Sequence, residues 1–361
     1  MRTLVATIIA TVLLAGCSND SNPSEPVVIP ESDAAQDVVL QEDAASEEAE
    51  AAVLPDAQPE SGVYPCGTQP PNPDSRKLPL DVTNAAPDLE LRTGSERIEL
   101  YARKSSSLTH EKLVDIANRS CEALTFDLKE FAVSATEPAL APAVRIIVLD
   151  DPTYDTATQA AGSYGVSYPE DGAYGDAVVV PESGLSSLVD FDDTLAHELT
   201  HIVHGRMAPN NYYITWFLIE GTATLAGTQY GMLKHNKPTD FVKGYLVGAT
   251  GADATLTFDR YGLEDKTQNM GEVGHDQALS AFFMEYLRVK HLRPDAGAGF
   301  ADVQARMLQA QMQVSDGSDE PTAFAAHMDG LSEPDAQKAF TQWLDATVGD
   351  SAARFGGTLF E

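Results

Sequence analysis

The stretch AHELTHIVHG, residues 196–205, constrains the fold more than any other part of the chain. His197 and His201 are four residues apart, so on an α-helix their imidazoles project from the same face, one turn apart. Two neutral imidazoles at that spacing can share one zinc ion at about 2.0–2.1 Å. Glu198 lies beside the first histidine, where it could take a proton from water held by the metal. The stretch therefore predicts a helix with a metal site on one face.

A catalytic zinc site needs a third protein ligand and an open position for water. Glu220 follows His201 after eighteen residues, within the apolar stretch WFLIEGTATLAGTQY. If both stretches are helices joined by a loop at residues 206–211, the hairpin brings Glu220 opposite the histidine pair. Its carboxylate would lie among apolar side chains and would need a counter-charge, which a cation supplies. We expect His197, His201 and Glu220 to hold one Zn²⁺ ion.

The pattern HELTH, eighteen residues and then E-G-x-A resembles the gluzincin zinc peptidases, the clan that contains thermolysin and the membrane-type aminopeptidases. The resemblance covers roughly residues 160 to 348. It implies that His197, His201 and Glu220 bind zinc and that Glu198 polarises the attacking water. The metzincin pattern does not fit, because it needs a glycine at position 204 and a histidine at position 207, where this chain has histidine and methionine.

The same resemblance implies a tyrosine or histidine some 55 to 65 residues after the glutamate ligand, which donates a hydrogen bond to the tetrahedral oxyanion. His275 stands fifty-five residues after Glu220 and opens the stretch HDQALSAFFMEYL. We assign it this role as a catalytic residue, with Tyr261 and Tyr245 as the alternatives. The remaining alternative is that His275 only begins a helix.

The chain departs from the family pattern at two places. Aminopeptidases carry a Gly-x-Met-Glu-Asn segment before the zinc helix, where this chain reads GDAVVVPES, so the sequence favours an endopeptidase. Thermolysin has an aspartate four residues after its glutamate ligand, and this chain has Thr224. Asp193, one turn before His197, could orient that imidazole instead; the alternative is a first-turn acid favoured by the helix dipole.

The other histidines are not predicted to bind metal. His204 precedes Gly205, and we expect it to meet the dipole at the C-terminal end of its helix. The contexts of four more are typical of surface or capping positions: His110, His235, His291 and His327.

The N-terminal residues MRTLVATIIATVLLAGC are typical of an export signal, because the apolar run is shorter than the about 20 residues that span a bilayer. Leu14–Cys17 resembles the lipobox of bacterial lipoproteins, which implies cleavage after residue 16 and a membrane anchor through lipidated Cys17. Ser18 then indicates the outer membrane or periplasmic face of the bacterial cell envelope. The alternative is an ordinary secretory signal.

Residues 17–60 are predicted to be a disordered acidic tether. Between Ser18 and Glu60 there are twelve acidic residues and no lysine or arginine, in a chain with a net charge of −32. Such a segment buries too little apolar surface to offset its chain entropy. The acidity excludes nucleic acid as a partner, since phosphate binding requires positive charge.

Cys66 and Cys121 are the two remaining cysteines. In an oxidising compartment we expect them to form a disulfide that constrains the unfolded chain by roughly 4 kcal/mol. The alternative is that Cys121, on the apolar stripe of a predicted helix, is a buried thiol.

The rest of the chain predicts an α+β fold with two lobes. Residues 61–190 read as a mixed α/β lobe with a small sheet: an extended segment to residue 87, a hairpin of 89–91 with 97–103, a helix at 109–131, and strands at 143–149 and 177–180. Residues 191–361 read as a helical catalytic lobe, with helices near 192–205, 214–230, 238–248, 275–291, 299–312, 321–328 and 333–347. We expect a thermolysin-like arrangement with the zinc site in the cleft between the lobes.

These observations predict a zinc-dependent peptidase, tethered to the bacterial envelope, that acts on a peptide or protein substrate. The strand at Ala177–Val180 is expected to hold the substrate by β-augmentation, as an edge strand does in the family. One alternative is a catalytically inactive, zinc-bearing surface lipoprotein that binds a protein partner. Another is a helical lipoprotein with a chance motif and no metal. The sequence does not constrain the oligomeric state.

Overall fold

The computed structural model describes residues 75–348, except 96, 135, 161–162, 169–172, 210–215, 236–279, 282, 285 and 293–299. All described residues belong to one compact unit. None of the helices in these ranges is long and apolar enough to cross a membrane. His275, Tyr261, Tyr245, Cys17 and the helix expected at 238–248 lie outside the described residues.

A five-stranded mixed sheet forms the first half of the fold. Its order is β1 (Leu89–Gly94), β2 (Ile98–Arg103), β3 (Val144–Leu149), β5 (Ala177–Pro181) and β4 (Val166–Tyr168). The outer pairs β1–β2 and β4–β5 are antiparallel, and the inner pairs are parallel. The hairpin of β1 and β2 and the strands β3 and β5 confirm the sequence prediction.

The expectation that β5 is an edge strand is wrong. β5 lies between β3 and β4, and the short strand β4 takes the outer position. Every residue of β5 is buried, as is typical of an inner strand that is covered on both faces.

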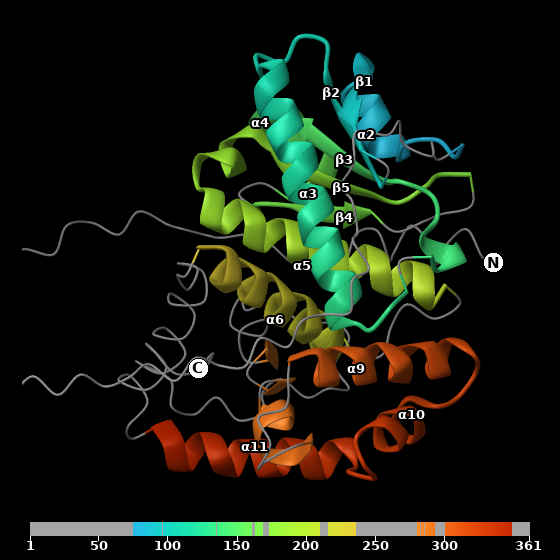
Figure 1. Ribbon diagram of the computed structural model, residues 1–361, viewed down its shortest axis with the longest axis vertical. Coiled ribbons are helices and arrows are strands. Elements are labelled where there is room, and N and C mark those ends of the chain that lie inside the picture. Colours follow the sequence, from blue (N-terminus) through green and yellow to red (C-terminus); the bar gives the residue numbers. More distant parts are fainter. Residues whose placement is uncertain are drawn as a thin grey trace, which may run out of the picture. The chain divides into compact units, whose positions relative to one another are not determined.

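Alternate residues of the sheet face two separate layers of helices (Figure 1). Ile146 and Val148 belong to a core with α3 (His110–Glu130) and α5 (Leu188–Met207). Ile147 and Leu149 belong to a core with α2 (Leu80–Ala85) and α4 (Asp151–Thr158). This period of two is what a strand buried on both faces requires.

Capping residues account for the ends of several helices. Thr109 accepts a hydrogen bond from the backbone of Lys112 at the start of α3, where the sequence predicted a helix. Asp150 caps α4 in the same way, so the Asp-Asp-Pro sequence that ends β3 also begins a helix. The extended segment expected before residue 87 is wrong over Leu80–Ala85, which form α2.

Cys121 is buried in α3 and its sulfur is disulfide-bonded. The alternative of a free buried thiol is therefore wrong. Cys66 lies outside the described residues, so its pairing with Cys121 stays a prediction.

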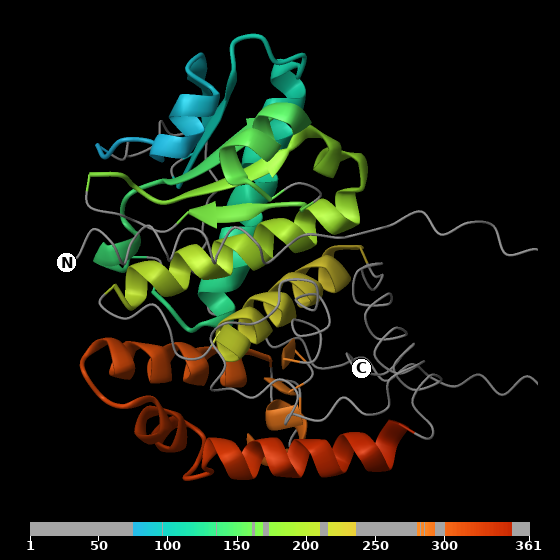
Figure 2. The same ribbon diagram turned by 180° about the vertical axis from the view of Figure 1, so that it is seen from behind.

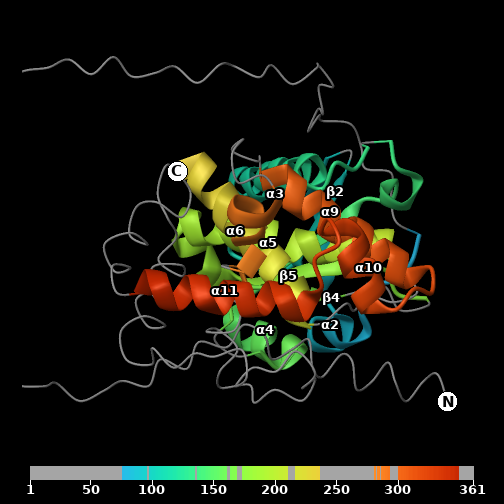
Figure 3. The same ribbon diagram turned by 90° about the horizontal axis from the view of Figure 1, so that it is seen from below.

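The second half of the fold is helical. The helices α6 (Trp216–His235), η4 (Leu287–Leu292, a π-helix), α9 (Phe300–Ser315), α10 (Glu320–His327) and α11 (Glu333–Val348) share a further apolar core. Figures 1 and 2 show α9 and α11 on the side of α5 and α6 that faces away from the sheet, and Figure 3 shows this side from below. The protein thus consists of a sheet with covering helices followed by a helical half, which agrees with the α+β fold predicted from the sequence.

Candidate metal centre

Helix α5 lies between the sheet and α6, and most of it is buried. It begins at Leu188 after Ser187, whose hydroxyl accepts a hydrogen bond from the backbone of Asp190. Its apolar residues pack against the sheet and α3. His197, Glu198 and His201 all lie on this helix, and their side chains are buried. The two histidines are separated by one helical turn.

Glu220 of α6 completes a triangle of candidate ligand atoms. Its Oε2 lies 3.3 Å from Nε2 of His197, and its Oε1 lies 3.2 Å from Nε2 of His201. The two Nε2 atoms are themselves 3.2 Å apart. Three ligands at about 2.0–2.1 Å from a tetrahedral zinc ion would be separated by about 3.3 Å. The sides of the triangle therefore match one face of a zinc tetrahedron, and the three residues can hold a metal ion together.

Electrostatics in the triangle favour bound positive charge. Burial lowers the pKa of His197, but the hydrogen bond to Glu220 and the charges of Glu220, Glu198 and Asp193 outweigh it and raise the pKa to about 9. Burial raises the pKa of Glu220, but the two imidazoles outweigh it and hold the pKa well below its usual range. Without a metal the site keeps a carboxylate and takes up a proton, so a divalent cation would displace that proton.

Two glycines let α6 approach its neighbours closely enough for Glu220 to reach the histidines. A Cβ on Gly227 would lie 2.7 Å from the backbone oxygen of Asp193 and 3.2 Å from Cβ of His197. A Cβ on Gly221, next to Glu220, would lie 2.8 Å from the carbonyl oxygen of Ser280. Both positions exclude larger residues, because real Cβ contacts under about 3.0 Å force the backbone to move.

Glu198 lies beside the triangle and faces the outer strand of the sheet. A Cβ on Gly165, directly before β4, would lie 3.2 Å from Cγ and 3.5 Å from Oε1 of Glu198. The same Cβ would collide with the side chain of Thr194 on α5. A carboxylate beside a metal site, at the edge of a strand, is placed to exchange protons with a molecule bound along that strand.

Asp193 is not a first-turn acid, because α5 begins at Leu188 and its first-turn acid is Asp190. Asp193 is buried one turn before His197, and its charge contributes to the raised pKa of that histidine. This location supports an electrostatic role toward His197. Thr224, at the position where thermolysin has an aspartate, is buried as well.

His204 lies in the last turn of α5, as its sequence context predicted, but its side chain is buried. Its ring is 0% exposed and packs edge-on against Phe131, with ring centroids 4.8 Å apart. Burial and the nearby His201 lower its pKa to about 3, so the ring is neutral and gains nothing from the helix dipole. Neither of its nitrogens has a hydrogen-bond partner in the part of the chain that the structure describes.

Three of the remaining histidines make specific contacts. His235 is the last residue of α6, and its half-buried ring contacts the buried carboxylate of Asp192 at 2.6 Å. His291 and His327 contact Met328 and Gln313 through their Nε2 atoms. Sequence reasoning missed Gly165, Gly227 and Asp192. Gly227 carried a signal, since a glycine inside a helix often marks a close contact.

Comparison with protein-family models and with curated proteins finds no match to this chain.

Proposed function

We propose that the protein is a zinc-dependent endopeptidase of the gluzincin type, tethered to a bacterial cell envelope. The observation that supports it most strongly is the triangle of His197, His201 and Glu220, whose sides of 3.2 to 3.3 Å match those of a zinc site. A structural zinc site is normally closed by four protein ligands, whereas a catalytic one uses three. Glu198, buried next to the triangle, has no role in a purely structural site.

The donor set fits zinc: two imidazole nitrogens and one carboxylate. A bound zinc ion would act as a Lewis acid on the scissile carbonyl and would acidify a coordinated water. Glu198 takes the proton from the attacking water and returns it to the leaving amine. Asp193 favours positive charge at His197 and so supports its part in binding the cation. His275 remains our candidate for the donor to the oxyanion, with Tyr261 and Tyr245 as alternatives.

The outer strand β4 is the best candidate to hold the substrate. It ends the sheet within the described residues, and Gly165 at its start lies against Glu198. An extended peptide that pairs with this strand would pass next to the general base. We therefore propose that the substrate pairs with β4 instead of β5. The thermolysin-like cleft would then lie between β4 and α5.

The cellular location is proposed from the N-terminal sequence. The lipobox-like Leu14–Cys17 and the acidic residues up to Glu60 favour a lipid anchor and a solvated spacer. The substrate would then be a peptide or protein in the cell envelope.

The decisive test is Glu198→Gln. The amide cannot accept the proton, so hydrolysis of casein or a peptide library should fall by about 10²–10⁴-fold, the usual contribution of a general base. Zinc content, measured by mass spectrometry, should stay at one ion per chain. The matched control is Glu111→Gln, which changes an exposed acid in the first turn of α3 and should retain full activity.

Each outcome separates two hypotheses. Activity that is lost with a chelator, restored by zinc and absent in Glu198→Gln supports the peptidase. A wild-type chain that binds zinc but cleaves no peptide supports the inactive, partner-binding lipoprotein instead. Undiminished turnover by Glu198→Gln would overturn the proposed mechanism.

A further inference from the structure

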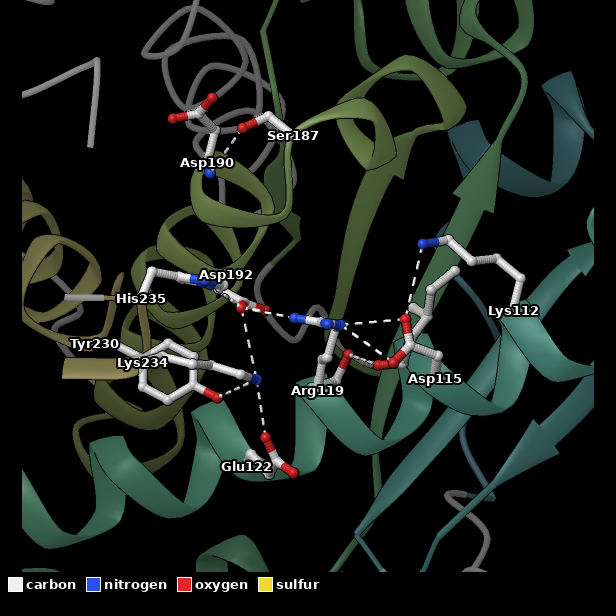
Figure 4. A network of polar contacts seen from close by, with 12 residues as sticks. Lys112, Asp115, Arg119, Glu122, Ser187, Asp190, Asp192, Tyr230, Lys234 and His235 are labelled. Atoms are coloured by element: carbon white, nitrogen blue, oxygen red, sulfur yellow. Dashed lines mark hydrogen bonds and ion pairs between the residues drawn. The ribbon is translucent and has the colours of Figure 1, made fainter. Parts of the chain in front are cut away.

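We propose that Asp192 is a positioning residue for the metal centre: it holds α6 against α5 so that Glu220 stays within ligand distance of the histidines. The inference rests on the proposed metal site. It concerns a buried ionic cluster (Figure 4) at the C-terminal end of α6, whereas Glu220 lies near the N-terminal end of that helix.

The carboxylate of Asp192 is 0% exposed and is surrounded by cationic side chains from two other helices. Nη1 of Arg119, on α3, donates a hydrogen bond to its Oδ2 at 2.8 Å. Nε2 of His235 lies 2.6 Å and Nζ of Lys234 lies 3.5 Å from the same oxygen. The last two residues of α6 are thus tied to α5 by a single buried carboxylate.

The partners of Asp192 are themselves held in place, as Figure 4 shows. Nε of Arg119 lies 3.1 Å from Asp115 on its own helix. Nζ of Lys234 donates to Glu122 at 2.8 Å and to the hydroxyl of Tyr230 at 3.1 Å. Burial lowers the pKa of Arg119, but the charges and hydrogen bonds of Asp192 and Asp115 outweigh it and raise the pKa. Asp192 is the point where these contacts converge.

Asp192 cannot act on the metal directly. On a helix with 3.6 residues per turn it lies about 140° and 180° around the axis from His197 and His201. Its effect on the site must therefore pass through α6, which carries Glu220.

α6 contacts α5 at Gly227, where an added Cβ would lie 2.7 Å from the backbone oxygen of Asp193, and this contact can act as a pivot for the helix. Glu220 lies seven residues before this contact, and His235 lies eight residues after it. At 1.5 Å per residue the two arms are about 10 Å and 12 Å long. A shift of about 1 Å at the His235 end would therefore move Glu220 by nearly as much, whereas a zinc site tolerates only about 0.2 Å in its distances.

The small contact at Gly227 does not by itself prevent such a rotation, because a glycine offers no side chain to interlock. The ionic contacts at Asp192 are directional, and a buried carboxylate holds its cations strongly, since an unpaired buried charge is costly. Two separated contacts fix both the angle and the register of a rigid helix. The structure thus assigns Asp192 the task of fixing the glutamate ligand from the far end of α6.

The test compares the zinc dissociation constant of the full-length chain with that of Asp192→Asn, by competition with a chromogenic chelator. The amide keeps the shape but not the charge, and the dissociation constant should rise about 10–100-fold, as for other residues that orient metal ligands. The control is Glu122→Gln, in the same cluster but with a side chain that is 56% exposed. Its dissociation constant should change by less than about threefold, because exposed ion pairs are weak.

A double-mutant cycle separates positioning from general destabilisation. If Asp192 acts through Glu220, Asp192→Asn should not weaken zinc binding further in a Glu220→Ala background. An equal loss in both backgrounds, or a folded Asp192→Asn chain with the wild-type dissociation constant, would overturn the inference.

Three further outcomes have defined consequences. If Asp192→Asn does not fold, His235→Gln takes its place in the same cycle; it removes the imidazole contact to Asp192, leaves Arg119 and Lys234 on Asp192, and should weaken zinc binding several-fold. A wild-type chain that binds no zinc overturns the proposed metal centre, and this inference with it. A chain that binds zinc but has no peptidase activity overturns the proposed function and leaves this inference intact.

Discussion

Two buried carboxylates on the same pair of helices are neutralised in different ways. Besides the imidazole of His235, Asp192 contacts a guanidinium and an ammonium group, which carry their charge at any physiological pH. Glu220 contacts two imidazoles, which are cationic only when they take up protons. The first carboxylate is compensated by the protein itself. The second is placed where an exchangeable cation, a proton or a metal ion, completes the site.

The largest expected effect comes from removing Glu220, the carboxylate whose cation can exchange. Glu220→Ala should raise the zinc dissociation constant roughly 10²–10³-fold, if the about 10–16 kcal/mol of a four-ligand zinc site is shared among its ligands. Chelator competition measures this constant, with Glu111→Ala as the control. An unchanged constant would contradict the role of Glu220 as a ligand and with it the contrast between the two carboxylates.

The next largest effect is expected in the pH dependence of zinc binding, because the imidazoles around Glu220 titrate whereas the guanidinium and ammonium groups at Asp192 do not. Below its pKa of about 9 the ring of His197 is protonated in the metal-free chain and must lose a proton to bind metal. Zinc affinity should therefore rise about tenfold per pH unit between pH 7 and 9 and then level off. The stability of the metal-free chain should follow the opposite trend: the raised pKa stabilises the fold below pH 6.5, and this contribution is lost as the pH rises through 9.

Zinc titrations in a series of buffers measure the first trend, and denaturant unfolding with a chelator measures the second. An affinity that does not change with pH would show that no proton leaves on binding.

A smaller effect is expected at the contact between the helices. Gly227→Ala places a methyl group 2.7 Å from the backbone oxygen of Asp193, so α6 must move away from α5. The free energy of unfolding should fall by about 1–3 kcal/mol, the usual cost of overpacking, and zinc binding should weaken. Gly184→Ala is the control, because its Cβ would make only ordinary contacts at 3.5 Å or more. Equal stability of the two variants would argue against a close contact at Gly227.

The smallest effect concerns Glu130, a partly buried acid with Asp127 as its acidic neighbour. Burial raises the pKa of Glu130 on α3 from 4.5 to about 7, and burial together with the charge of Glu130 raises the pKa of Asp127. The protonated form is favoured in the fold, so stability is highest below pH 4.5 and is lost as the pH rises through 7. Glu130→Gln should raise the free energy of unfolding at pH 8 by about 1–2 kcal/mol and leave it unchanged at pH 4. Denaturant unfolding at both values, with Glu111→Gln as the control, checks this; equal changes at both pH values would contradict it.

The parts of the fold that the sequence predicted are those with a strong local signal. The apolar spacing of α3 predicted both ends of that helix to within one residue. The buried strands β3 and β5 were visible as β-branched runs. The elements that were missed are short, since α2, α4 and β4 span six, eight and three residues. Such segments contain too few periods of their pattern to stand out.

In the candidate site, too, the residues with a local sequence signal were predicted and those without one were missed. The i, i+4 spacing of His197 and His201 is a property of one helix, and the hairpin predicted the approach of Glu220, which the structure brings to 3.2–3.3 Å. Asp192 had no such signal. Its partner Arg119 is 73 residues away along the chain, and the sequence does not distinguish the buried Asp192 from the other acids of LVDFDD.

By itself, the sequence determined which donor atoms are available and which of them share a helix face, because helical periodicity is a local property of the backbone. Only the tertiary structure decided how closely α6 approaches α5, which strand forms the edge beside Glu198, and which buried carboxylate receives permanent cations. Those features depend on contacts between segments far apart in the chain, where a glycine or a charge acts only through the neighbour that packing brings to it.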